Sequence, residues 1–102
     1  MGNGKPFYTD YVNHCLRLYC RYPTKCPDAS PVGKRNWETV EKVLGEYPAQ
    51  MREIIIYSYA HMANDVRTNV QEMSKITNIP TKEIWDAICE ASHRIAEVRE
   101  LI

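Results

Sequence analysis

The residues of this 102-residue chain best suited to chemistry are a histidine and three cysteines near the N-terminus, His14, Cys15, Cys20 and Cys26. Such nitrogen and thiolate ligands hold structural zinc, usually as two closely spaced pairs. The four residues here do not form two such pairs, and the neighbouring His14 and Cys15 point to different sides of a helix. We therefore favour the absence of a metal site and interpret Cys15 as a thiol buried on an apolar helix face.

A second pair of chemical interest, Cys89 and His93, lies four residues apart near the C-terminus. On a helix the two side chains share a face, which we place outward, so a reactive thiol or a metal pair is conceivable. Ordinary surface residues are the favoured interpretation. The chain has no recognisable set of nucleophile, base and orienting group, and no glycine-rich phosphate loop. We therefore expect no enzymatic activity and no cofactor.

The pattern with the most functional content is a helix-turn-helix at about residues 69–90. This motif needs a first helix with a small residue where the helices cross, which Met73-Ser74 provides, and a turn residue at positive φ, for which Asn78 is suited. The apolar positions of the turn and second helix are Ile79, Ile84 and Ile88. Two positions fit less well, because Thr77 stands where an apolar residue is usual and Asn78 stands in place of glycine.

Residues 48–102 resemble region 4 of bacterial sigma factors. They resemble still more closely the small sigma-like proteins of prophages and mobile elements in Gram-positive bacteria, including late-gene regulators of the RinA and ArpU type. The segment Arg52-Glu53-Ile54-Ile55 before the motif and the closing helix at 94–102 carry this resemblance. It implies a phage-type DNA-binding transcription regulator that acts with RNA polymerase in the cytoplasm of a bacterial host cell.

In a DNA-reading motif of this type, the first residues of the second helix face the major groove. Two positions there are unfavourable, since Asp86 opposes phosphates and Trp85 stands where the family often has a basic residue. Basic side chains from the N-terminal third can add phosphate contacts if the fold brings them beside the motif. The predicted DNA-binding residues are Lys75, Asn78, Thr81, Lys82, Trp85, Arg17, Arg21, Lys34 and Arg35.

The formal net charge of zero conceals an uneven distribution along the chain. Residues 1–36 hold six basic and two acidic side chains, whereas residues 37–63 hold two and four, and residues 64–102 hold five and seven. Acidic surfaces can occupy sites built for nucleic acid, which motivates a second hypothesis. In this alternative the chain is a mobile-element inhibitor that binds a host or defence protein, as anti-CRISPR proteins do. The predicted partner-binding residues are Trp85, Asp86, Cys89, Glu90 and His93.

A stripe of small residues beside a tryptophan runs along the last helix, formed by Trp85, Cys89, Ser92 and Ala96. Small side chains under a large one allow close helix approach, so the stripe suits a homodimer or partner surface. It equally suits packing against the tyrosine-rich first helix, which we favour.

The elements that position these residues are all helical, because apolar residues recur at three- and four-residue steps and no segment alternates with period two. We predict a single all-α domain of about five helices over residues 1–102, with a basic helix and loop at 1–36 and a helical core at 37–102 that ends in the helix-turn-helix. The length leaves no room for a second catalytic domain. No apolar run is long enough for a membrane span, and Met1–Pro6 contains no signal core. We therefore expect a cytoplasmic protein with free thiols and no membrane association.

The first helix is predicted over 7–22 and is followed by a loop over 23–35. Its apolar face is formed by Tyr8, Tyr11, Val12, Cys15, Leu18, Tyr19 and Tyr22. Asn36 is predicted to cap the second helix, whose buried stripe is Trp37, Val40, Val43, Leu44 and Tyr47.

Prolines and one capping pattern mark the predicted starts of the later helices. Pro48 suits the start of the third helix, with Met51, Ile54, Ile55, Ser58, Tyr59 and Met62 on one face. Thr68 and Gln71 have capping-box spacing for the fourth helix, which we expect to end near Ile76. Pro80 opens the last helix, predicted to reach the C-terminus along an inward seam of Ile84, Ile88, Ala91, Ile95, Val98 and Ile102.

Overall fold

The computed structural model describes residues 6–102 and contains five α-helices. They are α1 (Thr9–Arg21), α2 (Pro31–Leu44), α3 (Ala49–Ala60), α4 (Val66–Thr77) and α5 (Thr81–Val98). The all-α class and the number of helices agree with the sequence-based prediction. The prediction of a missing signal core rests on Met1–Lys5, which lies outside the described residues.

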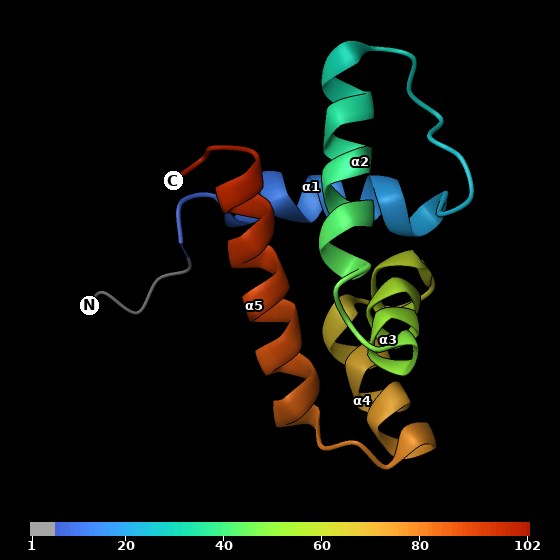
Figure 1. The fold of residues 1–102 in the computed structure, drawn as a ribbon. Coiled ribbons are helices and arrows are strands. Elements are labelled where there is room, and N and C mark those ends of the chain that lie inside the picture. Colours follow the sequence, from blue (N-terminus) through green and yellow to red (C-terminus); the bar gives the residue numbers. More distant parts are fainter. Residues whose placement is uncertain (1–5) are drawn as a thin grey trace.

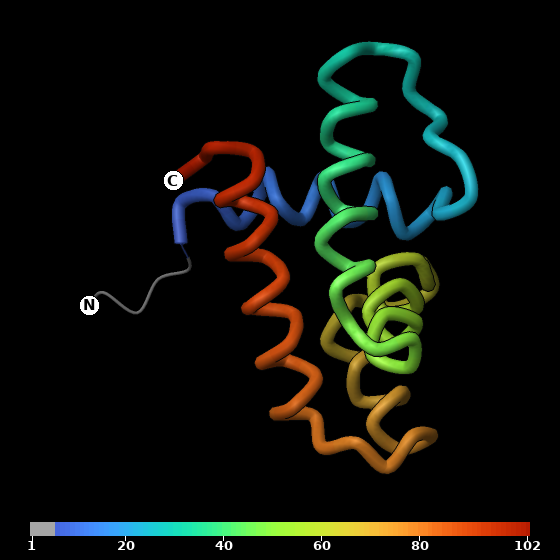
Figure 2. Tube along the Cα trace, in the orientation of Figure 1, coloured from blue at the N-terminus to red at the C-terminus, as the bar shows by residue number. Residues whose placement is uncertain are grey.

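The helices cross one another instead of forming an aligned bundle (Figure 1). Helix α1 lies across one side of α2 and α5, and the chain then passes through a long loop to the far end of α2. After α3, helix α4 runs to a tight turn at the lower end of the molecule in this view, and α5 returns from that turn to end near the start of α1. The tube in Figure 2 follows the same path. The α4–α5 turn therefore lies at one tip of the molecule.

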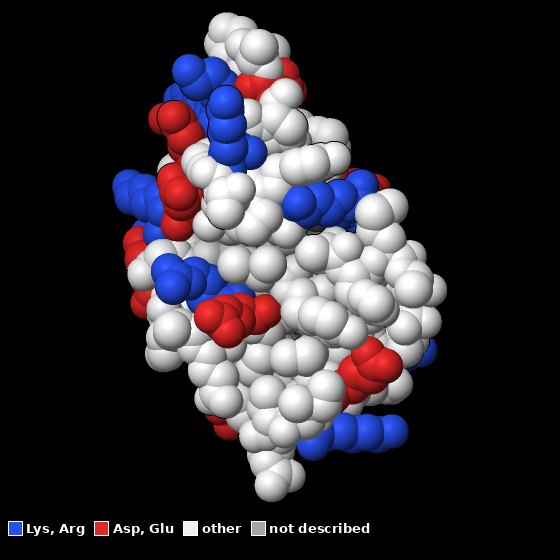
Figure 3. Space-filling model, turned by 90° about the vertical axis from the view of Figure 1, so that its right-hand side faces the viewer, with Lys and Arg blue, Asp and Glu red and all other residues white. Residues whose placement is uncertain are grey.

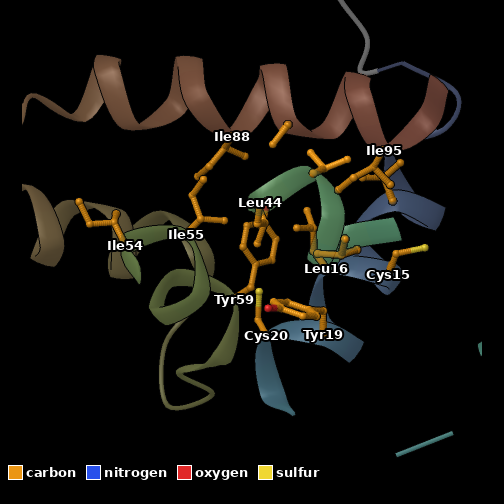
Figure 4. Close-up of a cluster of buried hydrophobic side chains, with 14 of the residues drawn as sticks. Cys15, Leu16, Tyr19, Cys20, Leu44, Ile54, Ile55, Tyr59, Ile88 and Ile95 are labelled. Carbon is orange, nitrogen blue, oxygen red and sulfur yellow. The ribbon is translucent and has the colours of Figure 1, made fainter. Parts of the chain in front are cut away.

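The core lies where α1, α2, α3 and α5 meet (Figure 4). Its fully buried side chains include Val12, Leu16, Val43, Leu44, Ile54, Ile55, Ile84 and Ile95. The predicted stripes of α2 and α3 are largely confirmed, although Met62 is exposed. The predicted face of α1 is rotated, because Leu16 and Cys20 are buried while Tyr22 is exposed. Tyr11 is exposed as well, whereas Tyr19 stays buried beside Leu16 and Cys20.

The predicted start of the second helix at Asn36 is wrong. The N-cap of α2 is Ser30, six residues earlier, and the helix begins at Pro31, because the Ser30 side chain accepts a 3.0 Å hydrogen bond from the Gly33 amide. Proline in the first turn suits this start, since its missing N–H would have no helical partner there. Asn36 is instead buried inside α2, and the predicted basic loop at 34–35 is the first part of a helix.

The predicted capping box of the fourth helix is also wrong. Helix α4 begins at Val66, and Asp65 is its N-cap, with Oδ1 accepting a 2.8 Å hydrogen bond from the Thr68 amide. This contact and the Thr68 side chain hold the pKa of the Asp65 carboxyl below its ordinary value. The backbone amide of Thr68 thus donates to the N-cap Asp65, and Thr68 is not the N-cap itself. Asp65 accepts from the amide that the predicted capping box assigns to the Gln71 side chain.

The last helix ends at Val98 and does not continue to the C-terminus. Glu100 adopts φ 60°, and the Leu101 amide donates a 2.8 Å hydrogen bond back to the Ala96 carbonyl, which is a Schellman-type termination. The predicted inward seam is confirmed through Ile95, whereas Ile102 is exposed. Within residues 6–102, no helix has the length and apolar character needed to span a membrane.

Candidate nucleic-acid interface at the α4–α5 turn

Helices α4 and α5 are joined by only three residues, 78–80, as the predicted motif requires. Asn78 has φ 65° and ψ 20°, so the predicted left-handed turn residue is confirmed. Its amide donates a 2.9 Å hydrogen bond to the Ser74 carbonyl and closes the last turn of α4. Asparagine tolerates this conformation better than other residues with a Cβ, which explains how the turn forms without glycine.

Two hydroxyl groups hold the turn in shape. Ser74 Oγ donates a 2.6 Å hydrogen bond to the Ile79 carbonyl on the far side of the turn. Thr77 Oγ1 donates to the Met73 carbonyl at 2.6 Å and accepts from the Ile79 amide at 3.3 Å. Thr77, which fits the usual apolar pattern poorly, therefore gives an acceptor to the Ile79 amide, which lies in the turn outside both helices.

Helix α3 packs against both α4 and α5, which also pack against each other. Asn69 of α4 is fully buried, and its Nδ2 donates to the Ser58 and His61 carbonyls, each at 2.9 Å. These carbonyls belong to the end of α3, so Asn69 caps one helix from the next. Val70 of α4 and Ile84 of α5 are fully buried in the same core. The three helices therefore pack as one unit.

The first two turns of α5 present polar side chains to solvent. Thr81, Lys82, Glu83 and Asp86 are all exposed, as are Lys75 and Asn78 at the end of α4. Lys82 Nζ lies 2.9 Å from Asp86 Oδ2, and the two side chains are 86% and 66% exposed. The hydrogen bond and charge of Asp86 raise the pKa of Lys82 above its ordinary value. The structure thus brings four of the predicted DNA-binding residues together at this tip, Lys75, Asn78, Thr81 and Lys82, and pairs Lys82 with Asp86.

Arg17 and Arg21 lie at the other end of α4. They line a hollow of about 160 Å³ with residues 64–66 of the α3–α4 connection, where α4 begins. Helix α4 has 12 residues, so its two ends are about 18 Å apart. These two arginines are therefore separated from Lys82 and the α4–α5 turn.

Lys34 and Arg35 lie farther still from the turn. They belong to the start of α2, which Figure 1 shows at the opposite end of the molecule from the α4–α5 turn. On the face drawn in Figure 3, Lys and Arg side chains are interspersed with Asp and Glu and form no single positive area. The fold does not bring the N-terminal basic residues round to the motif.

Trp85 faces the protein and not the groove of a bound duplex. It is half-buried and lines a hollow of about 280 Å³ between α1 and α5, together with Tyr8, Asn13, Tyr59, Cys89 and Ser92. The small-residue stripe of α5 thus faces α1, in keeping with the favoured sequence interpretation, and its last member, Ala96, is fully buried.

The other predicted partner-binding residues of α5 make separate polar contacts. Glu90 accepts a 2.8 Å hydrogen bond from the Tyr47 hydroxyl, which raises the pKa of that tyrosine in addition to the larger effect of its desolvation. His93 Nδ1 lies 3.4 Å from the Tyr8 hydroxyl, and His93 Nε2 lies 3.6 Å from Glu97 Oε2. The predicted partner-binding residues span about half of α5, from Trp85 to His93, and do not converge on a single centre.

The cysteines of the zinc alternative are divided between core and surface. Cys15 and Cys20 are buried, and desolvation raises the pKa of their thiols to about 11 and about 12. Figure 4 shows Cys20 beside Tyr19 and Tyr59 in the core. Cys26 is half-buried and Cys89 is exposed. Over residues 6–102 no three His, Cys, Asp or Glu side chains are grouped to hold a metal ion.

Sequence reasoning missed one polar cluster that fixes the end of α5. Arg99 Nε donates to Asn36 Oδ1 at 2.7 Å, and the Tyr11 hydroxyl donates to the same oxygen at 3.1 Å. The Lys82–Asp86 pair could have been found from its spacing of four residues. The Arg99 cluster could not, because its residues come from α1, α2 and the C-terminal segment and are 25 to 88 positions apart.

No protein family, curated protein or solved structure matches this chain. The function is therefore proposed from the geometry at the α4–α5 turn and from the sequence resemblance stated above.

Proposed function

We propose that this protein binds double-stranded DNA through a helix-turn-helix formed by α4 and α5. One observation carries the proposal: α4 ends in a three-residue turn with left-handed Asn78, and the exposed first turns of α5 lie at the tip of the molecule. A helix about 10–12 Å across fits a major groove about 12 Å wide. In this arrangement α5 enters the groove by its N-terminal end.

Thr81, Lys82 and Asp86 would face the base edges, while Lys75 and Asn78 at the end of α4 lie where a phosphate contact is expected. The positive end of the α5 dipole adds a favourable interaction with the DNA backbone. With the resemblance to sigma region 4, this supports a phage-type transcription regulator that acts beside RNA polymerase.

The test is duplex binding measured by fluorescence anisotropy, with 30-base-pair duplexes that carry a random-sequence centre. We expect binding at low salt that weakens as salt rises, because neutralised phosphates release counterions. Lys82→Glu should abolish most of this binding. Lys25→Glu is the matched control, since it reverses an exposed charge in the loop between α1 and α2. An absence of duplex affinity at low salt would refute the proposal.

The separation of charge favours a second function, binding of a host or defence protein. Arg17, Arg21, Lys34 and Arg35 lie away from the turn, while α5 exposes Glu83, Asp86, Glu90 and Glu97. An acidic helix of this kind complements a basic protein surface.

This alternative predicts that the tagged chain copurifies from host cells with one stoichiometric protein, that Glu90→Lys abolishes the complex, and that Glu38→Lys on α2 leaves it intact. Equal retention of the partner by both variants, or purification of the chain alone, would count against it.

A further inference from the structure

The Lys82–Asp86 pair at the tip of α5 carries an inference about base recognition, which rests on the proposed DNA binding. The ammonium nitrogen and the carboxylate oxygen are 2.9 Å apart, and both side chains are mostly exposed on the outward face. The pair therefore presents a hydrogen-bond donor and an acceptor side by side, ready for an outside partner.

A carboxylate in the major groove is repelled by phosphates, and a hydrogen bond from a base can offset this repulsion. Only cytosine N4 and adenine N6 are donors in that groove. Adenine places its N7 acceptor beside N6, and an ionised carboxylate has no proton to donate to N7. Asp86 therefore matches cytosine better than adenine, guanine or thymine.

Lys82 completes the match with the other base of the pair. In a C·G pair, cytosine N4 and guanine O6 are hydrogen-bonded to each other and lie about 2.9 Å apart, like other hydrogen-bonded N and O atoms. The spacing between Lys82 Nζ and Asp86 Oδ2 is the same, with donor and acceptor reversed. We propose that Lys82 and Asp86 together read the major-groove edge of one C·G base pair, with Asp86 on cytosine N4 and Lys82 on guanine O6 and N7.

This proposal gives Asp86, which is unfavourable for phosphate binding, a role in base recognition. Asp86 opposes non-specific phosphate binding, but it discriminates against every base pair that offers no donor at its position. The ion pair also holds Lys82 over the bases and away from the phosphates. Lower general affinity and higher selectivity are the expected consequence.

The experiment is selection of duplexes from a random-sequence pool by the full chain, followed by anisotropy on the selected sequence and its single-pair changes. We expect one required C·G pair, whose replacement by T·A weakens binding roughly tenfold or more. Asp86→Asn should change the selected base from cytosine to adenine, because an amide both accepts and donates and so matches N6 and N7 of adenine.

Glu83→Gln is the matched control, since it removes one exposed carboxylate from the same turn and should leave the selected base unchanged. Asp86→Ala gives a second check and should weaken the preference for the C·G pair to what Lys82 on guanine supplies, without selecting adenine. Circular dichroism would show whether each variant keeps its helices. If the wild-type chain binds duplexes but Asp86→Asn selects the same base, the pair does not read a base, although DNA binding stands. If no duplex binds, both proposals fail.

Discussion

Arg99 donates a 2.7 Å hydrogen bond from Nε to Oδ1 of Asn36, joining the residue after α5 to the interior of α2. Asn36 is only 2% exposed, so the charged guanidinium group of Arg99 donates to a buried acceptor. The Tyr11 hydroxyl of α1 shares the same oxygen. One carboxamide therefore ties three parts of the chain together at the end of the molecule opposite the α4–α5 turn.

We expect Asn36→Ala to lower the free energy of unfolding by about 2 kcal/mol, because hydrogen bonds to charged groups contribute more than neutral ones and both donors lose their buried acceptor. Urea denaturation would measure the change. Asn64→Ala, at an exposed position, is the control and should have little effect. In a double-mutant cycle, the effects of Asn36→Ala and Arg99→Ala should be clearly less than additive. Additive effects would mean that the contact is not energetically significant.

The division of the cysteines predicts two classes of thiol reactivity. At pH 8, Cys89 should react with a disulfide reagent fastest and half-buried Cys26 more slowly, whereas Cys15 and Cys20 should react only as the protein unfolds. Burial raises the pKa of both core thiols, so the reactive thiolate is scarce as well as inaccessible. Mass spectrometry of alkylated peptides would assign the sites, and Cys89→Ser should remove the fastest phase. Rapid modification of Cys15 or Cys20 in the native protein would contradict this arrangement.

The two ends of α4 should respond differently to pH. The Thr68 amide lowers the pKa of Asp65, so the stabilisation from the ionised cap is present above the unfolded-state pKa of about 3.9 and is lost as pH falls through the lower folded-state value. We expect Asp65→Asn to destabilise the protein at pH 7 and to match the wild type near pH 2 in thermal unfolding. Ser74→Ala should cost about 1 kcal/mol at both pH values, since its hydrogen bond to the Ile79 carbonyl involves no titratable group. A pH-independent effect of Asp65→Asn would show that the charge does not stabilise the cap.

The left-handed residue of the turn offers a test that separates backbone geometry from side-chain contacts. Asn78 has φ 65°, a region that residues with a Cβ adopt at a cost of roughly 1–2 kcal/mol. Asn78→Gly should therefore retain or increase stability, while Asn78→Ala should lower it by about 1 kcal/mol in urea denaturation. Greater stability of the alanine variant would mean that the turn does not keep this conformation in solution.

Local sequence signals predicted the helices and the α4–α5 turn, because apolar periodicity and the suitability of Asn78 for positive φ depend only on residues close by in the sequence. The starts of α2 and α4 were missed for a related reason. Two capping patterns competed at each start, and the structure uses the earlier one, at Ser30 and at Asp65. Spacing alone does not decide which of two competing caps a helix adopts, since Ser, Asp, Asn and Thr are all favoured N-cap residues.

The candidate site was predictable only in its local part. Lys75, Asn78, Thr81 and Lys82 are adjacent through the turn, so sequence placed them together. The position of Arg17 and Arg21 depends on how α1 crosses α3 and α5, which no short-range pattern encodes. The direction of Trp85 depends on the same crossing, because the residue faces α1 in the folded protein.

The separation of the basic residues from the turn predicts which charges govern salt dependence. If α5 enters the groove, Lys75→Ala should lower the slope of log affinity against log salt by about 1, as expected for one lost phosphate contact. Arg17→Ala and Arg21→Ala should leave the slope unchanged, because both side chains lie at the opposite end of α4. Anisotropy titrations between about 50 and 200 mM salt would measure this. A slope reduced by the arginine variants and not by Lys75→Ala would place the DNA against α1, and the α4–α5 turn would then not be the interface.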